Sequence, residues 1–209
     1  MSNANFFDSD YYERGLQTGK SCYQNYIWMP ELTIPLAMTI IDYLKIESNH
    51  TILDYGCSKG YLVKAFRMLH RQAWGVDISE YALSCVPEDI KQYCFMENGL
   101  LYVNIIFDYC VAKDVFEHME ISDLKRTLET LKANVLFAII PLGRNGKYNA
   151  EMNNMDISHI ICEDEIWWTD FFSSLHWDLL KFSFSVEGIK NSYVSIPEAH
   201  GFFVLKNMR

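Results

Sequence analysis

The segment that most constrains this chain is the turn at residues 54–60, Asp-Tyr-Gly-Cys-Ser-Lys-Gly. It follows the apolar run 51–53 and leads into residues 61–66, where apolar side chains recur with helical spacing. A second apolar run, 73–76, ends at Asp77. A strand, a glycine-rich turn, a helix, a second strand and an acid form half of a nucleotide-binding βαβ unit. The sequence therefore predicts a ligand site where the two strands end.

The spacing within this turn indicates which ligand it favours. A dinucleotide-binding turn has the pattern G-x-G-x-x-G, and its helix N-terminus faces a pyrophosphate. Here Asp54 precedes the first glycine, Gly56, and the pattern is D-x-G-C-x-x-G. A carboxylate at this position repels a pyrophosphate and favours a ligand with an amino group. Asp77, at the end of the next strand, can accept charge-assisted hydrogen bonds from two ribose hydroxyls.

Three segments together resemble the motifs of the class I S-adenosylmethionine (SAM)-dependent methyltransferases. The turn 54–60 resembles their first motif, and residues 75–79, Gly-Val-Asp-Ile-Ser, resemble the second. Residues 107–118, which begin Phe-Asp and end Glu-His, resemble the segment of the fourth strand. The three segments occur in the family's order within about residues 51–141. The resemblance implies that the chain binds SAM and releases S-adenosylhomocysteine after methyl transfer.

The apolar patterns predict an α/β fold. Strands are expected at 51–55, 73–77, 91–96, 105–111, 135–140, 179–185 and 201–206, and the main helices at 30–44, 60–70, 121–132 and 163–175. Alternation of strands and helices predicts a doubly wound, mostly parallel, seven-stranded sheet in a three-layer α/β/α arrangement. The last two strands lack a helical connection, so we expect an antiparallel C-terminal hairpin. The prediction is a single domain, with residues 1–50 as an aromatic and helical cap and 51–209 as the Rossmann-like core.

Composition limits the partners and the compartment. Among the 209 residues 50% are hydrophobic, the net charge is −9 and the pI is near 5.1, which disfavours nucleic acid as a partner. The six cysteines form no C-x-x-C pair, so we expect free thiols, a reducing compartment and no metal site. No signal peptide is recognisable, and prolines and acids interrupt the apolar segment 27–44. We therefore expect a cytoplasmic monomer or homodimer without a membrane span.

The family resemblance implies a set of cofactor-binding residues. These are Asp54, Gly56, Cys57, Gly60, Asp77, Ile78, Asn98, Lys113 and Asp114. Asp54 would lie near the amino end of SAM, Ile78 would pack on the adenine, and Asn98 would meet the adenine amino group. Lys113 and Asp114 would lie beneath the sulfonium. The alternative is structural: glycines that only shape a turn, Asp77 capping the next helix, and a packed Cys57.

The N-terminal segment is unusually rich in aromatic residues. Because SAM carries a positive charge on sulfur, aromatic faces such as that of Tyr26 would favour it over the neutral product. Arg14 would pair with the cofactor's carboxylate. Packing of the first long helix explains the same aromatic residues, so both readings stay open.

Two histidines are candidate catalytic residues. His159 ends the segment 156–159, Asp-Ile-Ser-His, which resembles the D-x-[ST]-H segment of small-molecule methyltransferases. Methylation of a hydroxyl requires loss of a proton, and a neutral imidazole titrates in the range suited to accept it. His118 belongs to the Glu-His pair after the fourth strand. The alternative for both is a histidine that only stabilises its loop.

The acceptor is predicted as an oxygen of a small molecule. The acidic chain and the segment 156–159 favour a sugar or sugar-linked group, as in bacterial surface-glycan biosynthesis. No N-P-P-Y tetrapeptide follows the fourth strand, which disfavours nucleobase N-methylation. Two alternatives remain: a nucleotide-dependent oxidoreductase on a Rossmann sheet, and a non-catalytic SAM-binding subunit of an active partner.

Overall fold

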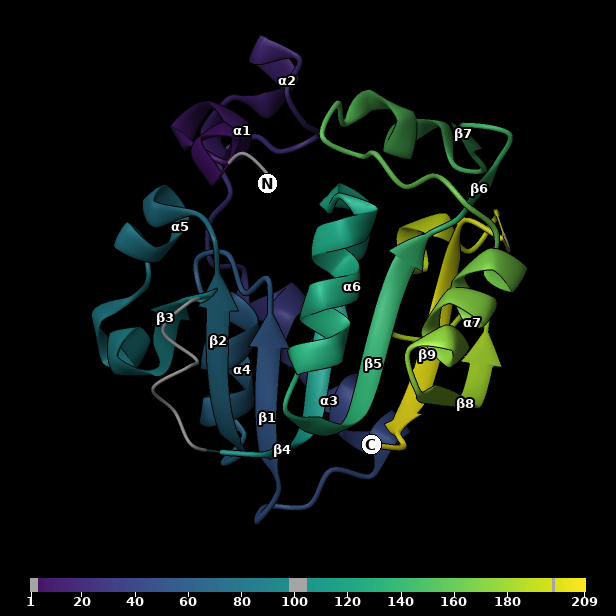
Figure 1. The fold of residues 1–209 in the computed structure, drawn as a ribbon. Coiled ribbons are helices and arrows are strands. Elements are labelled where there is room, and N and C mark those ends of the chain that lie inside the picture. The colour runs from purple at the N-terminus through teal and green to yellow at the C-terminus, as the bar shows by residue number, and fades with distance from the viewer. Residues whose placement is uncertain (1–3, 98–104, 197) are drawn as a thin grey trace.

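A seven-stranded sheet organises the computed structural model, which describes residues 4–97, 105–196 and 198–209 (Figure 1). The strands of this sheet are β1 (Thr51–Tyr55), β2 (Gln72–Asp77), β3 (Cys94–Met96), β4 (Phe107–Lys113), β5 (Ala133–Pro141), β8 (Trp177–Ser183) and β9 (His200–Asn207). The helices are α1 (Ser9–Glu13), α2 (Gly15–Thr18), α3 (Pro30–Leu44), α4 (Tyr61–Met68), α5 (Glu80–Ser84), α6 (Ile121–Thr130) and α7 (Glu165–Ser174). The predicted α/β fold class is confirmed.

The strand order is β3-β2-β1-β4-β5-β9-β8. The first five strands of this order are parallel to their neighbours, whereas β9 is antiparallel to both β5 and β8. The predicted antiparallel C-terminal hairpin is therefore present, and its second strand lies between β5 and β8. Because β1 and β4 lie on either side of the point where the strand order reverses, the chain leaves their carboxyl ends toward opposite faces of the sheet, which leaves a crevice for a ligand.

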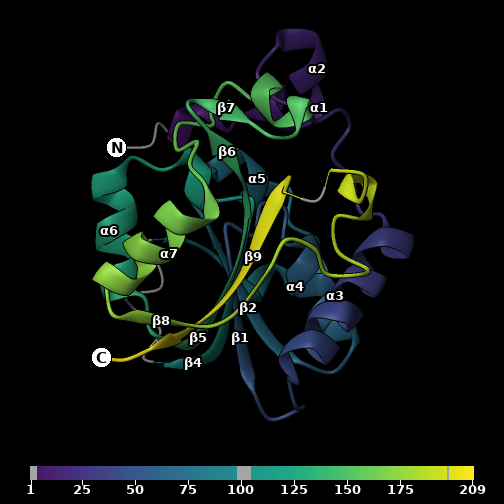
Figure 2. The same ribbon diagram turned by 90° about the vertical axis from the view of Figure 1, so that its right-hand side faces the viewer.

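Two hydrophobic cores cover the two faces of the sheet. In β5 the buried side chains alternate: Leu136 and Ala138 belong to one core, and Phe137 and Ile139 to the other. This alternation follows from the two-residue repeat of a strand. The first core contains residues of α6 and α7, and the second contains residues of α3 and α4. Viewed along the sheet, these helix pairs lie on opposite sides of it (Figure 2).

The N-terminal segment and a short hairpin lie above the carboxyl ends of the parallel strands (Figure 1). From here on the name cap is restricted to residues 4–29, because α3, which follows, packs in the second core. Its core is formed by Tyr11 and Tyr12, which pack with Ala82 of α5. The hairpin consists of β6 (Gly143–Arg144) and β7 (Lys147–Tyr148). The cap places aromatic side chains over the crevice.

Several element boundaries differ from the sequence prediction. The third strand is shorter than expected because residues 88–93 form a 3-10 turn after Pro87, and this turn buries Ile90. The fourth strand extends to Lys113 because its ladder with β5 continues to that residue. The β6–β7 hairpin was not predicted. Its turn residues Asn145 and Gly146 have φ of 55° and 74°, which is typical of an Asn-Gly hairpin turn.

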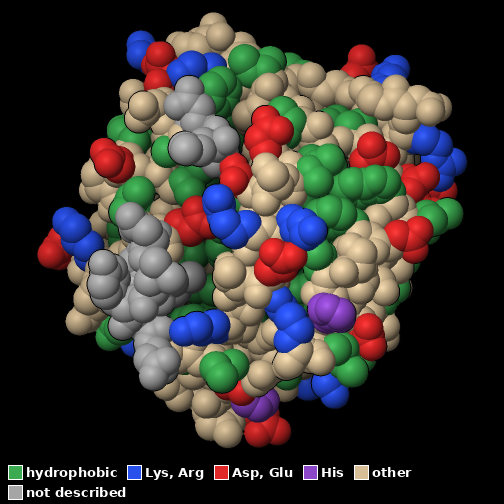
Figure 3. Space-filling model, in the orientation of Figure 1, with side chains coloured by type: hydrophobic (Ala, Val, Ile, Leu, Met, Phe, Trp, Pro, Cys, Tyr) green, Lys and Arg blue, Asp and Glu red, His purple; other side chains and the backbone are tan. Residues whose placement is uncertain are grey.

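Helix length and surface charge bear on the expected partners. None of the helices in the described ranges is long and apolar enough to cross a membrane. On the face drawn in Figure 3, lysine and arginine side chains alternate with acidic ones and form no continuous basic surface.

Two buried tryptophans allow a matched test of the core. Trp168 and Trp177 are both 0% exposed. The Trp177 indole donates a hydrogen bond to the Leu128 carbonyl at 3.1 Å, whereas the Trp168 Nε1 has no partner among the described residues. We expect Trp177→Phe to cost about 1–2 kcal/mol more than Trp168→Phe, because it leaves a buried carbonyl unpaired. Urea unfolding measures both, and equal costs would contradict the prediction.

Candidate functional site

A cavity of ≈ 200 Å³ lies at the carboxyl ends of β1, β2 and β4, beneath the cap. It is lined by nine of the predicted site residues: Asp54, Gly56, Cys57, Asp77, Ile78, Lys113, Asp114, Tyr26 and His118. Phe7, Tyr11, Tyr12 and Tyr23 add further cap residues to its wall. In open α/β sheets ligands bind at this position. The structure thus brings most of the predicted residues to one place.

The glycine-rich turn requires glycine for two different reasons. Gly56 has φ of 77°, and a Cβ there would lie 2.4 Å from the Val115 side chain. Gly60 has φ of 72° and precedes α4, and a Cβ there would meet Cys94 and Ile90 at 2.8 Å. Gly56 lines the cavity, whereas Gly60 does not. The first glycine therefore brings backbone to the ligand site, and the second allows the helix to pack against its neighbours.

Asp77 fixes the glycine-rich turn from the neighbouring strand. Its two carboxylate oxygens accept hydrogen bonds from the backbone N–H groups of Ser58 at 2.7 Å and Ser79 at 2.8 Å. Burial raises the pKa of Asp77, and these backbone hydrogen bonds oppose the rise. Ser79, not Asp77, caps α5 with its side chain. Each carboxylate oxygen retains a lone pair, so Asp77 can still accept hydrogen bonds from a ligand in the cavity.

Cys57 is a packing residue. Its Cβ and Sγ lie 2.7 Å from the position that a Cβ on Gly75 would occupy, so the two residues interlock between β1 and β2. A hydrogen bond with Cys94, together with burial, raises the pKa of the Cys57 thiol well above its usual value. A protonated, packed thiol is a poor nucleophile.

Asp54, the penultimate residue of β1, is buried, with 4% of the residue exposed. Burial raises its pKa to about 7, against the attraction of Lys113. A carboxyl group held near its titration point by burial gains most from a cationic partner, because the partner restores the interaction that water supplied. Asp54 is thus prepared to pair with a positively charged group in the cavity.

A group of charged residues lies beneath the same cavity. Asp114 has φ of 55° and accepts contacts from the ammonium groups of Lys113 at 2.7 Å and Lys190 at 2.6 Å. Burial would raise the pKa of Asp114, but these two cations hold it well below its usual value. Lys190 comes from the connection between β8 and β9. Its contact ties this connection to the floor of the site, a role that the sequence did not reveal.

The cap is attached to the glycine-rich turn by a buried lysine. The Lys59 ammonium contacts the Glu13 carboxylate and donates to the Tyr26 carbonyl at 2.7 Å, and its side chain is only 6% exposed. Tyr26 lies above the cavity with its ring 5.8 Å from the same ammonium. The sequence prediction overlooked Lys59 because a lysine within a turn is usually solvated.

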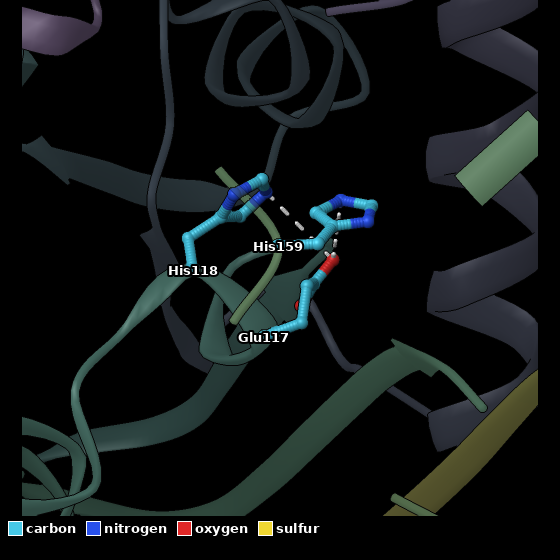
Figure 4. A group of neighbouring side chains, drawn as sticks. All are labelled: Glu117, His118 and His159. Atoms are coloured by element: carbon cyan, nitrogen blue, oxygen red, sulfur yellow. Dashed lines mark ion pairs between the residues drawn. The ribbon is translucent and has the colours of Figure 1, made fainter. Parts of the chain in front are cut away.

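His118 and His159 lie together beside Glu117 (Figure 4). Glu117 and His118 come from the 3-10 turn Phe116–His118 after β4, and the two imidazole rings are 4.6 Å apart. The Glu117 carbonyl accepts hydrogen bonds from the backbone N–H groups of Ile160 and Ile161, which hold the His159 loop against this turn. Burial lowers the pKa of His118 to about 4, and it also lowers the pKa of His159. Both imidazoles are therefore neutral at pH 7.

Three predicted residues, His159, Gly60 and Arg14, are not among those that line the cavity. Arg14 is exposed, and its guanidinium pairs with Asp10 within the cap. Asn98 lies outside the described residues, but its neighbour Glu97 lines the cavity and accepts a hydrogen bond from the Tyr55 hydroxyl.

A family model described as a methyltransferase domain matches residues 31–139. The match covers β1 to β5 and includes the glycine-rich turn, Asp77 and the Lys113–His118 segment. The chain belongs to this family. It is a class I methyltransferase, and its cofactor is SAM. The oxidoreductase alternative is therefore set aside.

Solved structures with the same fold are distant in sequence. An S-adenosylmethionine-dependent methyltransferase from Clostridium acetobutylicum has 14% identity and a TM-score of 0.60, over 83% of this chain and 91% of that one. A 1,6-didemethyltoxoflavin-N1-methyltransferase from Burkholderia thailandensis has 13% identity and a TM-score of 0.60, over 99% and 89%. The mitomycin 7-O-methyltransferase MmcR has 12% identity and a TM-score of 0.60, over 93% and 65%. No curated protein matches the methyltransferase in sequence.

The buried carboxyl group of Asp54 predicts a pH-dependent stability. Because its pKa is raised in the folded methyltransferase, the folded state loses stability as pH rises through 7 and regains it toward pH 4. We expect Asp54→Asn to raise stability at pH 8 by on the order of 2 kcal/mol, about 4–8 °C in Tm, and to have less effect at pH 4. The control Asp178→Asn, at an exposed position of β8, changes stability by less than about 0.5 kcal/mol. A gain that is equal at pH 4 and pH 8 would contradict the prediction.

Removal of the Lys59 ammonium should loosen the attachment of the cap to the glycine-rich turn. Lys59→Met leaves the Glu13 carboxylate and the Tyr26 carbonyl without their ammonium partner. We expect limited proteolysis of the methyltransferase to cut residues 14–29 at least about tenfold faster, because local opening costs less free energy. The control Lys20→Met breaks the more exposed pair with Asp8 and leaves the cutting rate nearly unchanged. Similar rates in both variants would refute the role of Lys59.

Proposed function

We propose that the enzyme transfers the methyl group of SAM to an oxygen of a small-molecule acceptor, and that this acceptor is a sugar or a sugar-linked group. The observation that carries the proposal is the neutral His118 imidazole on the cavity wall, beside the Lys113–Asp114 floor. A hydroxyl loses its proton as the new bond to carbon forms, and a neutral imidazole can accept it.

The cavity residues fit SAM in three respects. The backbone at Gly56 leaves no room for a side chain, as expected where a ligand and the chain approach closely. Asp54 supplies a buried carboxylate for the cofactor's amino group, and Asp77 has free lone pairs for the ribose hydroxyls. Aromatic side chains of the cap, including Tyr26, surround the same space and favour a sulfonium. When bound, SAM supplies an electrophilic methyl group.

The histidine cluster supports an oxygen acceptor. His118 donates through Nδ1 to the Ser158 hydroxyl at 2.8 Å, because that hydroxyl in turn donates to Asp156. This assignment from the hydrogen-bond network leaves a lone pair on Nε2 of His118. His159 donates through Nδ1 to the Asn153 carbonyl at 2.8 Å, which likewise leaves its Nε2 free. We propose His118 as the group nearest the acceptor, with His159 behind it as a second proton acceptor.

The rest of the catalytic effect is assigned to positioning. The cap covers the cavity and excludes water, and an acceptor held in line with the methyl group reacts without further reorganisation. The mitomycin 7-O-methyltransferase is named for an oxygen acceptor, and the toxoflavin enzyme for a nitrogen acceptor. A glycan acceptor rests on the resemblance of residues 156–159 to the D-x-[ST]-H segment, and bacterial surface-glycan biosynthesis is the context proposed for it.

The test is a transfer assay with SAM and a panel of nucleotide sugars, monosaccharides, phenols and amines. S-adenosylhomocysteine formation is followed together with the mass gained by each acceptor. We expect a methyl ether on a hydroxylated acceptor, preferably a nucleotide sugar. His118→Gln should lower kcat at least about a hundredfold with little change in SAM affinity, because general-base catalysis contributes on the order of 10²–10⁴.

Binding and transfer are separated by titration calorimetry with SAM and S-adenosylhomocysteine. Asp77→Asn should weaken both ligands about tenfold or more, since one charge-assisted hydrogen bond contributes about 1.5–3 kcal/mol. The surface variant His50→Ala serves as the control for both assays. Methylation of amines alone would overturn the oxygen assignment. Cofactor binding without transfer to any acceptor would instead favour a SAM-binding subunit.

A further inference from the structure

A compact cluster of possible metal ligands lies beside the cavity. It consists of the side chains of Glu117, His118 and His159. Nε2 of His118 lies 3.8 Å from Oε1 of Glu117, and Nε2 of His159 lies 3.9 Å from the same oxygen. One donor atom from each of the three side chains lies within 4.8 Å of the other two. Figure 4 shows both imidazoles on the same side of the Glu117 carboxylate. The three side chains therefore converge on one point.

Each of the three side chains can present a lone pair, not a hydrogen, at that point. The Nδ1–H groups of both histidines are engaged by oxygen, at Ser158 and at the Asn153 carbonyl. Histidines that bind a metal through Nε2 usually have such a partner on Nδ1, since it fixes the tautomer and the ring orientation. Asp156 extends the arrangement, because its carboxylate accepts a hydrogen bond from the Ser158 hydroxyl. The outer contacts of a metal site are thus already present.

Glu117 makes the cluster unusual. Its side chain is 0% exposed, and among the described residues neither carboxylate oxygen has a hydrogen-bond partner. A buried carboxylate without partners is strongly unfavourable, so either a proton or a cation must neutralise it. A water molecule can donate only two hydrogen bonds to the three acceptors. A divalent cation satisfies all three at once.

We propose that Glu117, His118 and His159 bind a divalent transition-metal ion of the zinc type. Three atoms no more than 4.8 Å apart share a point within about 2.8 Å of each, against about 2.0–2.2 Å for zinc–nitrogen and zinc–oxygen bonds. The side chains would close by less than about 1 Å per ligand. Two imidazoles select Zn²⁺, Fe²⁺ or Co²⁺ over Mg²⁺ and Ca²⁺, which prefer oxygen ligands.

The cluster lies at the edge of the cavity. His118 is among the residues that line the cavity, whereas Glu117 and His159 are not, so an ion held by the three would lie beside the acceptor space. Three protein ligands and one open position are typical of catalytic rather than structural zinc. With an ion bound, both Nε2 lone pairs would serve as ligands, so the ion would take over activation of an acceptor hydroxyl and the proton would pass to solvent. The inference concerns metal binding alone and does not depend on which acceptor is methylated.

The test titrates purified full-length enzyme with Co²⁺ and with Zn²⁺ after removal of bound metal by a chelator. We expect one ion per chain and a visible Co²⁺ spectrum without the intense near-ultraviolet bands of thiolate ligands. This spectral difference separates the cluster from the free cysteines. Calorimetry gives the affinity, and a Zn²⁺-dependent rise in Tm gives a second readout that requires no activity.

Three variants assign the ligands. Glu117→Gln and His159→Ala should each weaken binding by at least about a hundredfold, and Ser158→Ala by about 10–100-fold through the orientation of His118. His50→Ala is the matched control and should bind like the wild type. Circular dichroism and S-adenosylhomocysteine binding establish that each variant is folded.

Some results would overturn the inference. These are the absence of stoichiometric binding in the folded wild type, binding that survives in Glu117→Gln and His159→Ala, and a thiolate spectrum. A wild type that binds no ion but methylates normally would leave the proposed function intact and would identify the histidines as proton acceptors only.

Discussion

The shape of the cavity depends on two anchors of the glycine-rich turn. One is the Asp77 carboxylate, and the other is the Lys59 ammonium with its partner, the Glu13 carboxylate. Asp77 accepts the Ser58 backbone N–H from one side, and Lys59 extends from the same turn to Glu13 and the Tyr26 carbonyl of the cap. Since both anchors are buried, their partners cannot be replaced by water without cost. One short segment thus sets the position of the ligand floor and of the aromatic wall above it.

The charged side chains around the cavity are not fully paired with one another, so a bound ligand can supply the missing partners. Asp54 is buried with its pKa near 7, whereas Lys113 and Lys190 share the single carboxylate of Asp114. Glu117 lies nearby without a hydrogen-bond partner among the described residues. Preorganised charges of this kind cost stability in the free protein and contribute binding free energy when a complementary ligand arrives. The stability of this fold is therefore coupled to its function at identifiable side chains.

Sequence patterns predicted the features that depend on residues close together in the chain. The glycine-rich turn, Asp77 and the strand–helix alternation lie within single βαβ units, and all were located with errors of a few residues. The missed features depend on contacts between distant segments: Lys59 with Glu13, and Lys190 with Asp114. The convergence of His159 on Glu117 belongs to the same class, because the two histidines are far apart in the chain and their spacing predicts no metal site. The Asn145-Gly146 turn, in contrast, is local, and an Asn-Gly pair between two extended segments is sufficient to predict a hairpin.

One long-range contact has a consequence for synthesis on the ribosome. The Tyr11 hydroxyl donates to Asp156 at 2.9 Å, across a separation of 145 residues. At about 5–20 residues per second, on the order of ten seconds or more pass between the emergence of these two partners. During that interval the parallel strands β1 to β5 can assemble, and the cap can pack on Ala82 and contact Lys59, while the bond from Tyr11 to Asp156 is still missing. The cap can thus dock early on α5 and the glycine-rich turn, but its wall of the cavity is fixed from the far side only after the segment around Asp156 has been made.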